Sequence, residues 1–251
     1  MVVWHECMNR QDIDLNAAPD LRTTGLPLWK RALDLAVIVL LFPVLLLLAG
    51  GVALAVMCGS RGPVIYRQRR VGYKGREFLC YKFRTLYADT ETDSHRNHTR
   101  QLMNTDVPMT KLDARSDPRL IPLGAVLRAS GLDELPQLIN VLRGEMSIVG
   151  PRPCIPYEYE LYEPWQRRRF DAVPGLTGLW QVSGKNRTTF TEMIRLDIEY
   201  AERSSLCFDL QLILRTLPAI WRQCAESCAR RKSVAKAAPP GIAKPVQLYH
   251  L

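Results

Sequence analysis

The sequence lacks the cysteine spacing that is typical of a zinc site or of a disulfide framework. Its seven cysteines are an odd number and are scattered along the chain. Because structural disulfides belong to oxidising compartments, this usage favours a reducing surrounding for the soluble part. The sequence also lacks an internal repeat, and the block from Gly59 to Arg222 is near the usual size of one domain.

Charged side chains are missing between Leu35 and Cys58. Roughly 20 consecutive apolar residues are enough for a helix to cross the hydrocarbon core of a bilayer. A cleavable signal peptide is excluded, because the run is too long, starts late and has no small-residue cleavage site behind it. The sequence therefore predicts a membrane-inserted segment over residues 29–60.

Pro43 lies near the middle of this run and leaves two topologies open. Proline has no N–H and clashes with the preceding turn, so it kinks or breaks a helix. The helix either crosses the bilayer with a kink, or bends at Pro43 and returns to its own side. The positive-inside rule places clusters of basic residues in the cytoplasm, and both flanks of the run are basic. The re-entrant topology is therefore favoured. The flanking cations are Lys30, Arg31, Arg61, Arg67, Arg69 and Arg70.

Four segments follow from these patterns. Residues 1–28 are expected to be a flexible leader, residues 29–60 the membrane segment, residues 61–223 a compact catalytic domain, and residues 224–251 a disordered basic tail. The formal net charge is +9. A basic balance suits anionic lipid, phosphorylated ligands and nucleic acid alike, so charge alone does not separate these partners.

The predicted fold class is α+β and mostly helical, with a small β-hairpin. Strands are expected at Val64–Gln68 and Glu77–Thr85, because alternating residues are bounded by glycine-containing turns. Leu135, Leu138, Ile139 and Leu142 are spaced as the core-facing stripe of a helix that begins at Asp133, with Gly144 as its left-handed cap. Further helices are expected over residues 119–128, 155–170, 189–203 and 206–223. Thr189 and Glu192 open the third with a capping box, and the last is an amphipathic helix in the membrane interface or on the domain.

Asp133 and Glu134 are the strongest candidates for chemistry. They lie at a predicted helix N-terminus, where unpaired amides and the positive end of the dipole favour an ionised carboxylate or a bound phosphate. The structural alternative is ordinary capping, since Asp is a common N-cap residue.

An unusual number of cations is expected on rigid backbone near this pair. Lys82 and Arg84 share one face of an otherwise apolar strand, and Arg152 stands between two prolines. Because prolines fix the neighbouring φ angles, the Arg152 guanidinium is expected to face an oxyanion such as phosphate. Carboxylates and cations together suggest metal-assisted phosphoryl transfer, and a polar network that joins helices to a loop is the alternative. Arg119 and Arg128 also belong to this set.

Five segments carry a family resemblance: Tyr81-Lys82-Phe83-Arg84-Thr85, Leu132-Asp133-Glu134-Leu135-Pro136-Gln137-Leu138, Asn140-Val141-Leu142-Arg143-Gly144-Glu145-Met146-Ser147, Val149-Gly150-Pro151-Arg152-Pro153, and Pro174-Gly175-Leu176-Thr177-Gly178-Leu179-Trp180-Gln181-Val182. In order and spacing, from about Lys30 to Leu217, they resemble the short form of the bacterial sugar transferases. These are monotopic polyprenyl-phosphate phosphoglycosyl transferases.

The resemblance implies an enzyme that transfers a sugar 1-phosphate from a UDP-sugar to undecaprenyl phosphate and releases UMP. This step would begin the synthesis of an exopolysaccharide, capsule, O-antigen or glycoconjugate. The family's apolar helix is re-entrant and broken at the place of Pro43, which implies a catalytic domain on the cytoplasmic face of the inner membrane. The implied partners are the UDP-sugar, polyprenyl phosphate and membrane lipid, with no nucleic acid, and a homodimer is a further expectation.

The resemblance also implies roles for single residues. Asp133 matches the nucleophile that forms a phosphosugar-aspartyl intermediate, Glu134 matches its partner, and Mg²⁺ is expected at both. The implied substrate-binding residues are Lys82, Arg84, Arg128, Arg152 and Gln181.

Two features depart from the family pattern. Many relatives carry a basic residue before the Pro-Gly-Leu-Thr-Gly loop, where this chain has Val173, so one phosphate contact is in question. Arg167, Arg168 or Arg169 is expected to replace it. The stretch from Tyr87 to Asp117 is the least family-like part, and no site residue is assigned in it.

Two other functions compete with this one. A membrane-anchored adaptor that binds anionic lipid or nucleic acid would need no Asp-Glu pair. A phosphotransferase of the CDP-alcohol type would need several spanning helices, so the single apolar run disfavours it.

Overall fold

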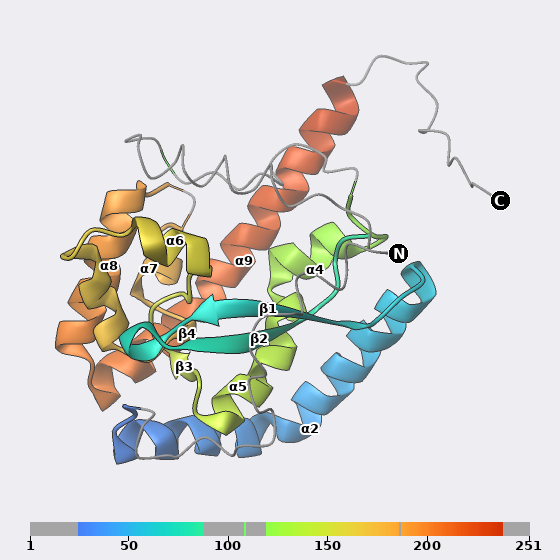
Figure 1. Cartoon of the computed structure of the whole chain (residues 1–251). Helices are drawn as coiled ribbons and strands as arrows, with labels where there is room; N and C mark the ends of the chain where they lie inside the picture. The colour runs from blue at the N-terminus through green and yellow to red at the C-terminus, as the bar shows by residue number, and fades with distance from the viewer. Residues whose placement is uncertain (1–24, 88–107, 109–118, 186, 238–251) are drawn as a thin grey trace.

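The computed structural model describes residues 25–87, 108, 119–185 and 187–237 (Figure 1). Most of the predicted leader and nearly all of the stretch from Tyr87 to Asp117 lie outside these residues. The described part is mostly helical with small sheets, which confirms the α+β class. Its elements in chain order are α2 (Leu28–Gly59), β1 (Ile65–Val71), η2 (Tyr73–Gly75), β2 (Glu77–Phe83), α4 (Gly124–Ser130), η4 (Leu132–Gln137), α5 (Leu138–Arg143), β3 (Ser147–Val149), α6 (Pro156–Leu161), η5 (Gln166–Asp171), β4 (Gly175–Thr177), α7 (Leu179–Val182), α8 (Phe190–Arg203) and α9 (Leu206–Ala237).

The predicted β-hairpin is present. Strands β1 and β2 pair antiparallel, with Ile65 opposite Phe83 and Val71 opposite Glu77. A second pair, which the sequence did not predict, joins β3 and β4 in parallel, with Ser147 beside Gly175. This pair is non-local and only three residues long on each side, so it leaves no periodic signal in the sequence.

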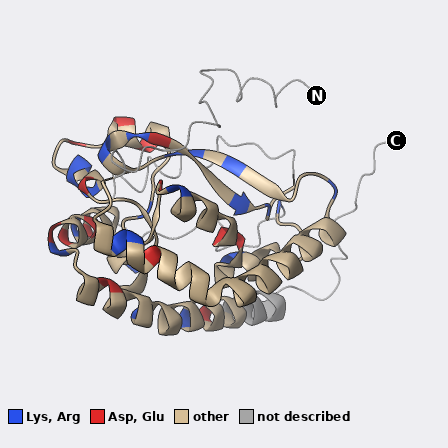
Figure 2. Ribbon diagram, turned by 90° about the horizontal axis from the view of Figure 1, so that it is seen from below, with Lys and Arg blue, Asp and Glu red and all other residues tan. Residues whose placement is uncertain are grey.

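Helix α2 is continuous through Pro43, and Figure 1 shows it bending along its length. The predicted break is therefore a bend within one helix, as is common where proline removes a single hydrogen bond. Among the described helices, α2 is the one that is long and apolar enough to enter a membrane. Figure 2 shows long helical stretches without charged residues, and α2 carries none after Asp34.

Both halves of α2 pack against the same domain. Before Pro43, Ile38 is buried in a core cluster with Phe78 of β2. After Pro43, Val52 and Val56 are buried in another cluster with Phe83, at the far end of the same strand. The side of α2 between these contacts is exposed and apolar, at residues that include Leu40, Leu47 and Phe42.

The helix predicted from Asp133 differs from expectation. It begins as the 3-10 turn η4 and becomes α-helical only at Leu138. Because a 3-10 turn has three residues per turn, the buried face shifts relative to an α-helix. Ile139 and Leu142 of the predicted core stripe are exposed, whereas Asn140 and Val141 are fully buried.

Later helices were predicted with mixed success. The helix expected over residues 155–170 is wrong: α6 and η5 are separate, because Pro164 disfavours helical backbone at the residue before it. The capping box of α8 is confirmed, with Thr189 and Glu192 bonding reciprocally at 2.8 and 3.2 Å. A disordered tail from residue 224 is also wrong as far as Ala237, where α9 ends. Residues 238–251 lie outside the described part.

Candidate active site

The carboxylate pair lies on η4, a short 3-10 segment between α4 and α5. Gly131 precedes it with φ 75°, a left-handed conformation that glycine adopts without strain and that redirects the chain. Asp133 is buried, at 8% exposure. Glu134 is partly buried, with 24% of its side chain exposed. Both acids therefore lie within the fold and are not solvated caps of a surface helix.

Two cations converge on Glu134. Lys82 of β2 donates from Nζ to Glu134 Oε1 at 2.7 Å. The Arg152 guanidinium, from the loop between β3 and α6, is 3.6 Å from the same oxygen. Strand alternation places Lys82 on the same face as Cys80 and Phe78, whose side chains are buried in the core. The lysine stem is thus held by packing while its ammonium reaches the acid.

A small cavity opens beside Glu134. Its lining holds one acid and three cations among apolar and amide side chains. Within the described residues, the Oε1 atom of Gln181 is buried without a hydrogen-bond partner. An unpaired buried oxygen of this kind marks a position where a ligand or an ordered water would be stabilised. The lining residues are Arg70, Cys80, Lys82, Glu134, Gln137, Arg152, Pro153, Gly175, Leu176 and Gln181.

The structure separates the other predicted residues from this lining. Asp133 is adjacent to Glu134 in sequence but does not line the cavity. Arg84 donates to the backbone carbonyls of Ser60, Arg61 and Pro63 at 2.7–3.0 Å, so its guanidinium binds the chain just after α2. The Nε of Arg128 donates to the Thr85 hydroxyl at 2.9 Å.

Glu134 is held in its ionised form. Burial alone would favour the neutral acid, but the attraction of Lys82, Arg152 and Lys185 outweighs it. The pKa of Glu134 is therefore well below its ordinary value. The cavity consequently combines a fixed negative charge with a surplus of positive charge.

The backbone around Arg152 is held by a buried ion pair. Arg169, which is 2% exposed, donates to the Arg152 carbonyl at 2.8 Å and to the Tyr162 hydroxyl at 2.7 Å, and it also binds Asp197. Burial raises the pKa of Asp197 to about 6, against the opposing attraction of Arg169. Because Arg169 bonds the Arg152 carbonyl and the buried Asp197 together, it fixes the course of the loop that carries Arg152.

None of the three arginines expected to replace the basic residue at Val173 lines the cavity. Val173 itself is buried in the core. Arg169 is committed to Asp197, Arg168 pairs with Glu202 at 2.6 Å, and Arg167 donates to a backbone carbonyl. The added positive influence on Glu134 comes from Lys185 instead.

Sequence reasoning did not single out Arg70, Gln137, Cys80 or Lys185 as site residues. Strand alternation could have found Cys80, which lies two residues before Lys82. Its thiol is inert, because burial raises its pKa. Arg70 is almost fully buried, donates to the Pro153 carbonyl at 3.3 Å and leaves its Nε without a partner among the described residues. Its contact with the cavity depends on non-local folding, so no sequence spacing reveals it.

The donor set suits a magnesium ion that is completed by substrate. Among the described residues, no three His, Cys, Asp or Glu side chains gather as a self-sufficient metal site. Magnesium commonly takes only one or two carboxylates and fills its remaining positions with phosphate oxygens and water. Asp133 and Glu134 supply two adjacent carboxylates on η4, and the orphaned Gln181 oxygen is a neutral donor that shares the cavity lining with Glu134.

Comparison with known proteins identifies relatives over most of the chain. A family model described as bacterial sugar transferase matches residues 26–223. The exopolysaccharide production protein ExoY of Sinorhizobium fredii (strain NBRC 101917 / NGR234) is 37% identical over 195 residues, which are 76% of this chain and 84% of that protein.

Two further relatives have similar extent. ExoY of Rhizobium meliloti (strain 1021) is 38% identical over 206 residues, covering 76% of this chain and 84% of the relative. The UDP-glucose:undecaprenyl-phosphate glucose-1-phosphate transferase of Caulobacter vibrioides (strain ATCC 19089 / CIP 103742 / CB 15) is 39% identical over 221 residues, covering 84% and 76% respectively.

Proposed function

Because this chain belongs to the bacterial sugar transferase family, we propose that it transfers a sugar 1-phosphate from a UDP-sugar to undecaprenyl phosphate and releases UMP. The observation that carries the proposal is the cavity in which Lys82, Arg152 and Arg70 surround the ionised Glu134. A pocket with a surplus of fixed cations suits a diphosphate. Its attachment to an apolar membrane helix suits a lipid acceptor.

The proposed reaction proceeds in two displacements at one phosphorus atom. An oxygen of Asp133 attacks the phosphorus that bears the sugar, forming an O–P bond while the bond to the UMP oxygen breaks. A phosphate oxygen of the lipid then attacks the same phosphorus and displaces Asp133, which regains its carboxylate. Lys82 and Arg152 stabilise the negative charge that develops on the phosphoryl oxygens.

Glu134 keeps these cations in place without being consumed. Its ionised carboxylate holds the Lys82 ammonium at 2.7 Å, so the lysine is already oriented before substrate binds. Asp133 and Glu134 would hold Mg²⁺, which when bound would neutralise diphosphate charge and polarise the phosphoryl oxygens. The unpaired oxygen of Gln181 in the cavity lining supports a role for this side chain in orienting a polar group of the donor.

The re-entrant topology belongs to the same proposal. Residues on both sides of Pro43 pack on the same domain, which supports a helix that enters the bilayer and returns. The basic flanks support a cytoplasmic location for that domain, at the inner membrane, where a nucleotide sugar is available. The lipid phosphate would then meet the cavity at the membrane surface.

The test uses the full-length chain purified in detergent with Mg²⁺, undecaprenyl phosphate and a panel of UDP-sugars. We expect UMP release by the wild type with at least one sugar, loss of release in Asp133→Asn, and loss on chelation that added Mg²⁺ restores. Asp171→Asn is the matched control, because Asp171 is exposed and pairs only with the surface residue Lys74 in the described structure. Undiminished release by Asp133→Asn would overturn the nucleophile, and an inactive wild type across the panel would favour the adaptor.

A further inference from the structure

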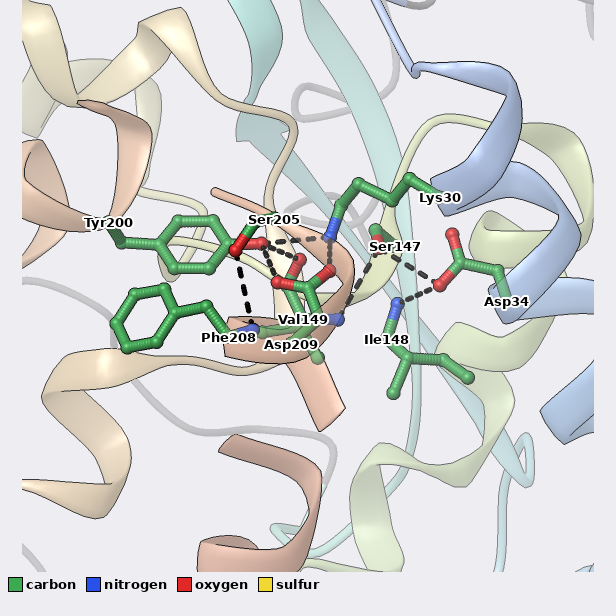
Figure 3. Close-up of polar contacts among 9 residues, drawn as sticks. All are labelled: Lys30, Asp34, Ser147, Ile148, Val149, Tyr200, Ser205, Phe208 and Asp209. Carbon is green, nitrogen blue, oxygen red and sulfur yellow. Dashed lines mark hydrogen bonds and ion pairs between the residues drawn. The ribbon is translucent and has the colours of Figure 1, made fainter. Parts of the chain in front are cut away.

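Two charged residues in the first turns of α2 are buried against the domain (Figure 3). Lys30 is 4% exposed and Asp34 is 1% exposed, although both belong to the membrane helix. Charged side chains in such helices are stabilised only where they face protein or water. Asp34 contacts β3, the short strand that precedes the Arg152 loop, and Lys30 is linked to the same strand through Tyr200.

Asp34 holds the beginning of β3. Its Oδ1 accepts from the Ser147 hydroxyl and from the backbone N–H of Ile148, both at 2.9 Å. Ser147 is fully buried, so water does not compete for these bonds. A carboxylate that accepts from a side chain and from a backbone amide fixes the strand in both position and rotation.

Lys30 holds the end of β3 through a buried tyrosine. Its ammonium donates to the Tyr200 hydroxyl at 2.8 Å and also binds Asp209 of α9. The same hydroxyl is 3.0 Å from the Val149 carbonyl and 2.8 Å from Asp209. Figure 3 shows Tyr200, Asp209 and the Val149 backbone gathered around the lysine ammonium.

The strand held in this way leads directly to the site. Only Gly150 and Pro151 separate Val149 from Arg152, and proline restricts the backbone between them. Both residues are also fixed from the other side: Gly150 donates to Thr177 of β4 at 2.8 Å, and Gly175 donates to Pro151 at 2.9 Å. A displacement of β3 would therefore move the Arg152 guanidinium relative to Glu134.

We infer that Lys30 and Asp34 are positioning residues for the transfer reaction. They fix β3, and through it Arg152, only when the first half of α2 is seated on the domain. Correct seating of the membrane helix is thereby a condition for an assembled active site. The activity arm of the test rests on the proposed function, whereas the structural arm does not.

The structural arm is hydrogen–deuterium exchange of the purified full-length protein in lipid nanodiscs. We expect Asp34→Ala to increase exchange in peptides covering residues 146–153, because the Ile148 amide loses its acceptor. Asp34→Asn, which keeps an acceptor oxygen, should restore most of the protection. The matched control is Val52→Ala, another truncation of a buried α2 side chain, which contacts no residue of β3 in the core clusters. Unchanged exchange in Asp34→Ala, or an equal increase in Val52→Ala, would overturn the inference.

The activity arm is a double-mutant cycle between Asp34 and Arg152. We expect Asp34→Ala alone to lower kcat by on the order of tenfold to hundredfold, as small misplacements of catalytic groups do. In an Arg152→Ala background the same change should lower kcat by less than about twofold, because the misplaced group is already absent. If kcat of the double variant falls by the product of the two single-variant factors, Asp34 acts independently of Arg152.

The two arms also separate this inference from the proposed function. An inactive wild type with the expected exchange pattern would contradict the proposed function and leave the positioning contact standing. The positioning role would be contradicted if the wild type is active and Asp34→Asn folds, but Asp34→Asn shows neither more exchange protection nor a higher kcat than Asp34→Ala.

Discussion

At the scale of single residues, Glu134 is an acid whose surroundings keep it charged. Lys82, Arg152 and Lys185 together outweigh the effect of burial on its pKa. The negative charge of Glu134 in turn offsets the repulsion among the surrounding cations before substrate binds. A phosphate that enters the cavity would share these cations with Glu134, so the acid also moderates how tightly the product is held.

The lowered pKa of Glu134 makes a pH-dependent prediction for stability. The Glu134 carboxylate binds a proton more weakly in the folded state than in the unfolded chain, where its pKa is near 4.5. Its contribution is therefore fully present above about pH 4.5 and is lost as the pH falls below that value. We expect Glu134→Gln to lower the unfolding temperature at pH 7, and the gap from wild type to shrink towards pH 3.5.

Thermal unfolding in detergent at both pH values would measure this gap. Glu202→Gln is a suitable control, because Glu202 is an exposed acid that pairs with Arg168 and such pairs contribute little. A gap for Glu134→Gln that stays constant between pH 7 and pH 3.5 would contradict the assigned pKa direction.

At the scale of elements, the β3–β4 pair depends on the absence of a side chain at Gly175. A Cβ atom added to Gly175 would lie 2.0 Å from the Gly150 nitrogen and 2.5 Å from the Val149 carbonyl carbon. Backbone atoms cannot move aside as the end of a flexible side chain can. The two segments can therefore approach this closely only with glycine at residue 175.

We expect Gly175→Ala to destabilise the protein by about 1–3 kcal/mol or more, as other overpacked sites do, and to abolish transfer. The strand that carries the Arg152 loop would be forced away from β4. Gly51→Ala is the matched control, because a Cβ there meets no atom within 4 Å. Gly51 is in a helix, where alanine is favoured by about 1 kcal/mol. Equal unfolding temperatures for the two variants would contradict this account.

Local chemistry explains which elements could be predicted from the sequence. The hairpin, the capping box at Thr189 and the left-handed cap at Gly144 depend on residues close together in the chain, and all three are present. The buried face of the segment that begins with η4 did not follow the sequence pattern, because Pro136 and a tight turn change the helical period. The exposure of Ile139 follows from that change and has no signature of its own.

The residues of the candidate site also differ in whether the sequence could indicate them. The motifs indicated Lys82, Glu134 and Arg152, and the fold brings these three together. The motifs also indicated Arg84, whose partners are backbone carbonyls after α2. A motif states which residue type is required and not whether its role is structural. Arg70 reaches the cavity through tertiary packing alone.

At the scale of the whole molecule, α2 is attached to the domain along both of its halves. A helix that crossed the bilayer would carry one of these halves to the opposite side. The proposed topology therefore predicts that Leu28 and Arg61, exposed residues near the two ends of α2, face the same compartment.

Single-cysteine variants Leu28→Cys and Arg61→Cys, made in a cysteine-free background, would test this topology in intact cells. We expect neither site to react with a membrane-impermeant maleimide added outside, and both to react after the inner membrane is permeabilised. Labelling of one site but not the other in intact cells would indicate a spanning helix.

The pairing of Lys30 with Asp209 also has a consequence for how the protein is made. The two residues are 179 positions apart, so the lysine leaves the ribosome long before its partner exists. At about 5–20 residues per second the delay is roughly 10 to 35 s. Until Asp209 has been synthesised, the Lys30 ammonium lacks this carboxylate partner. Helix α2 is therefore synthesised well before the carboxylate that pairs with Lys30, and a nascent chain that ends before Asp209 cannot form this ion pair.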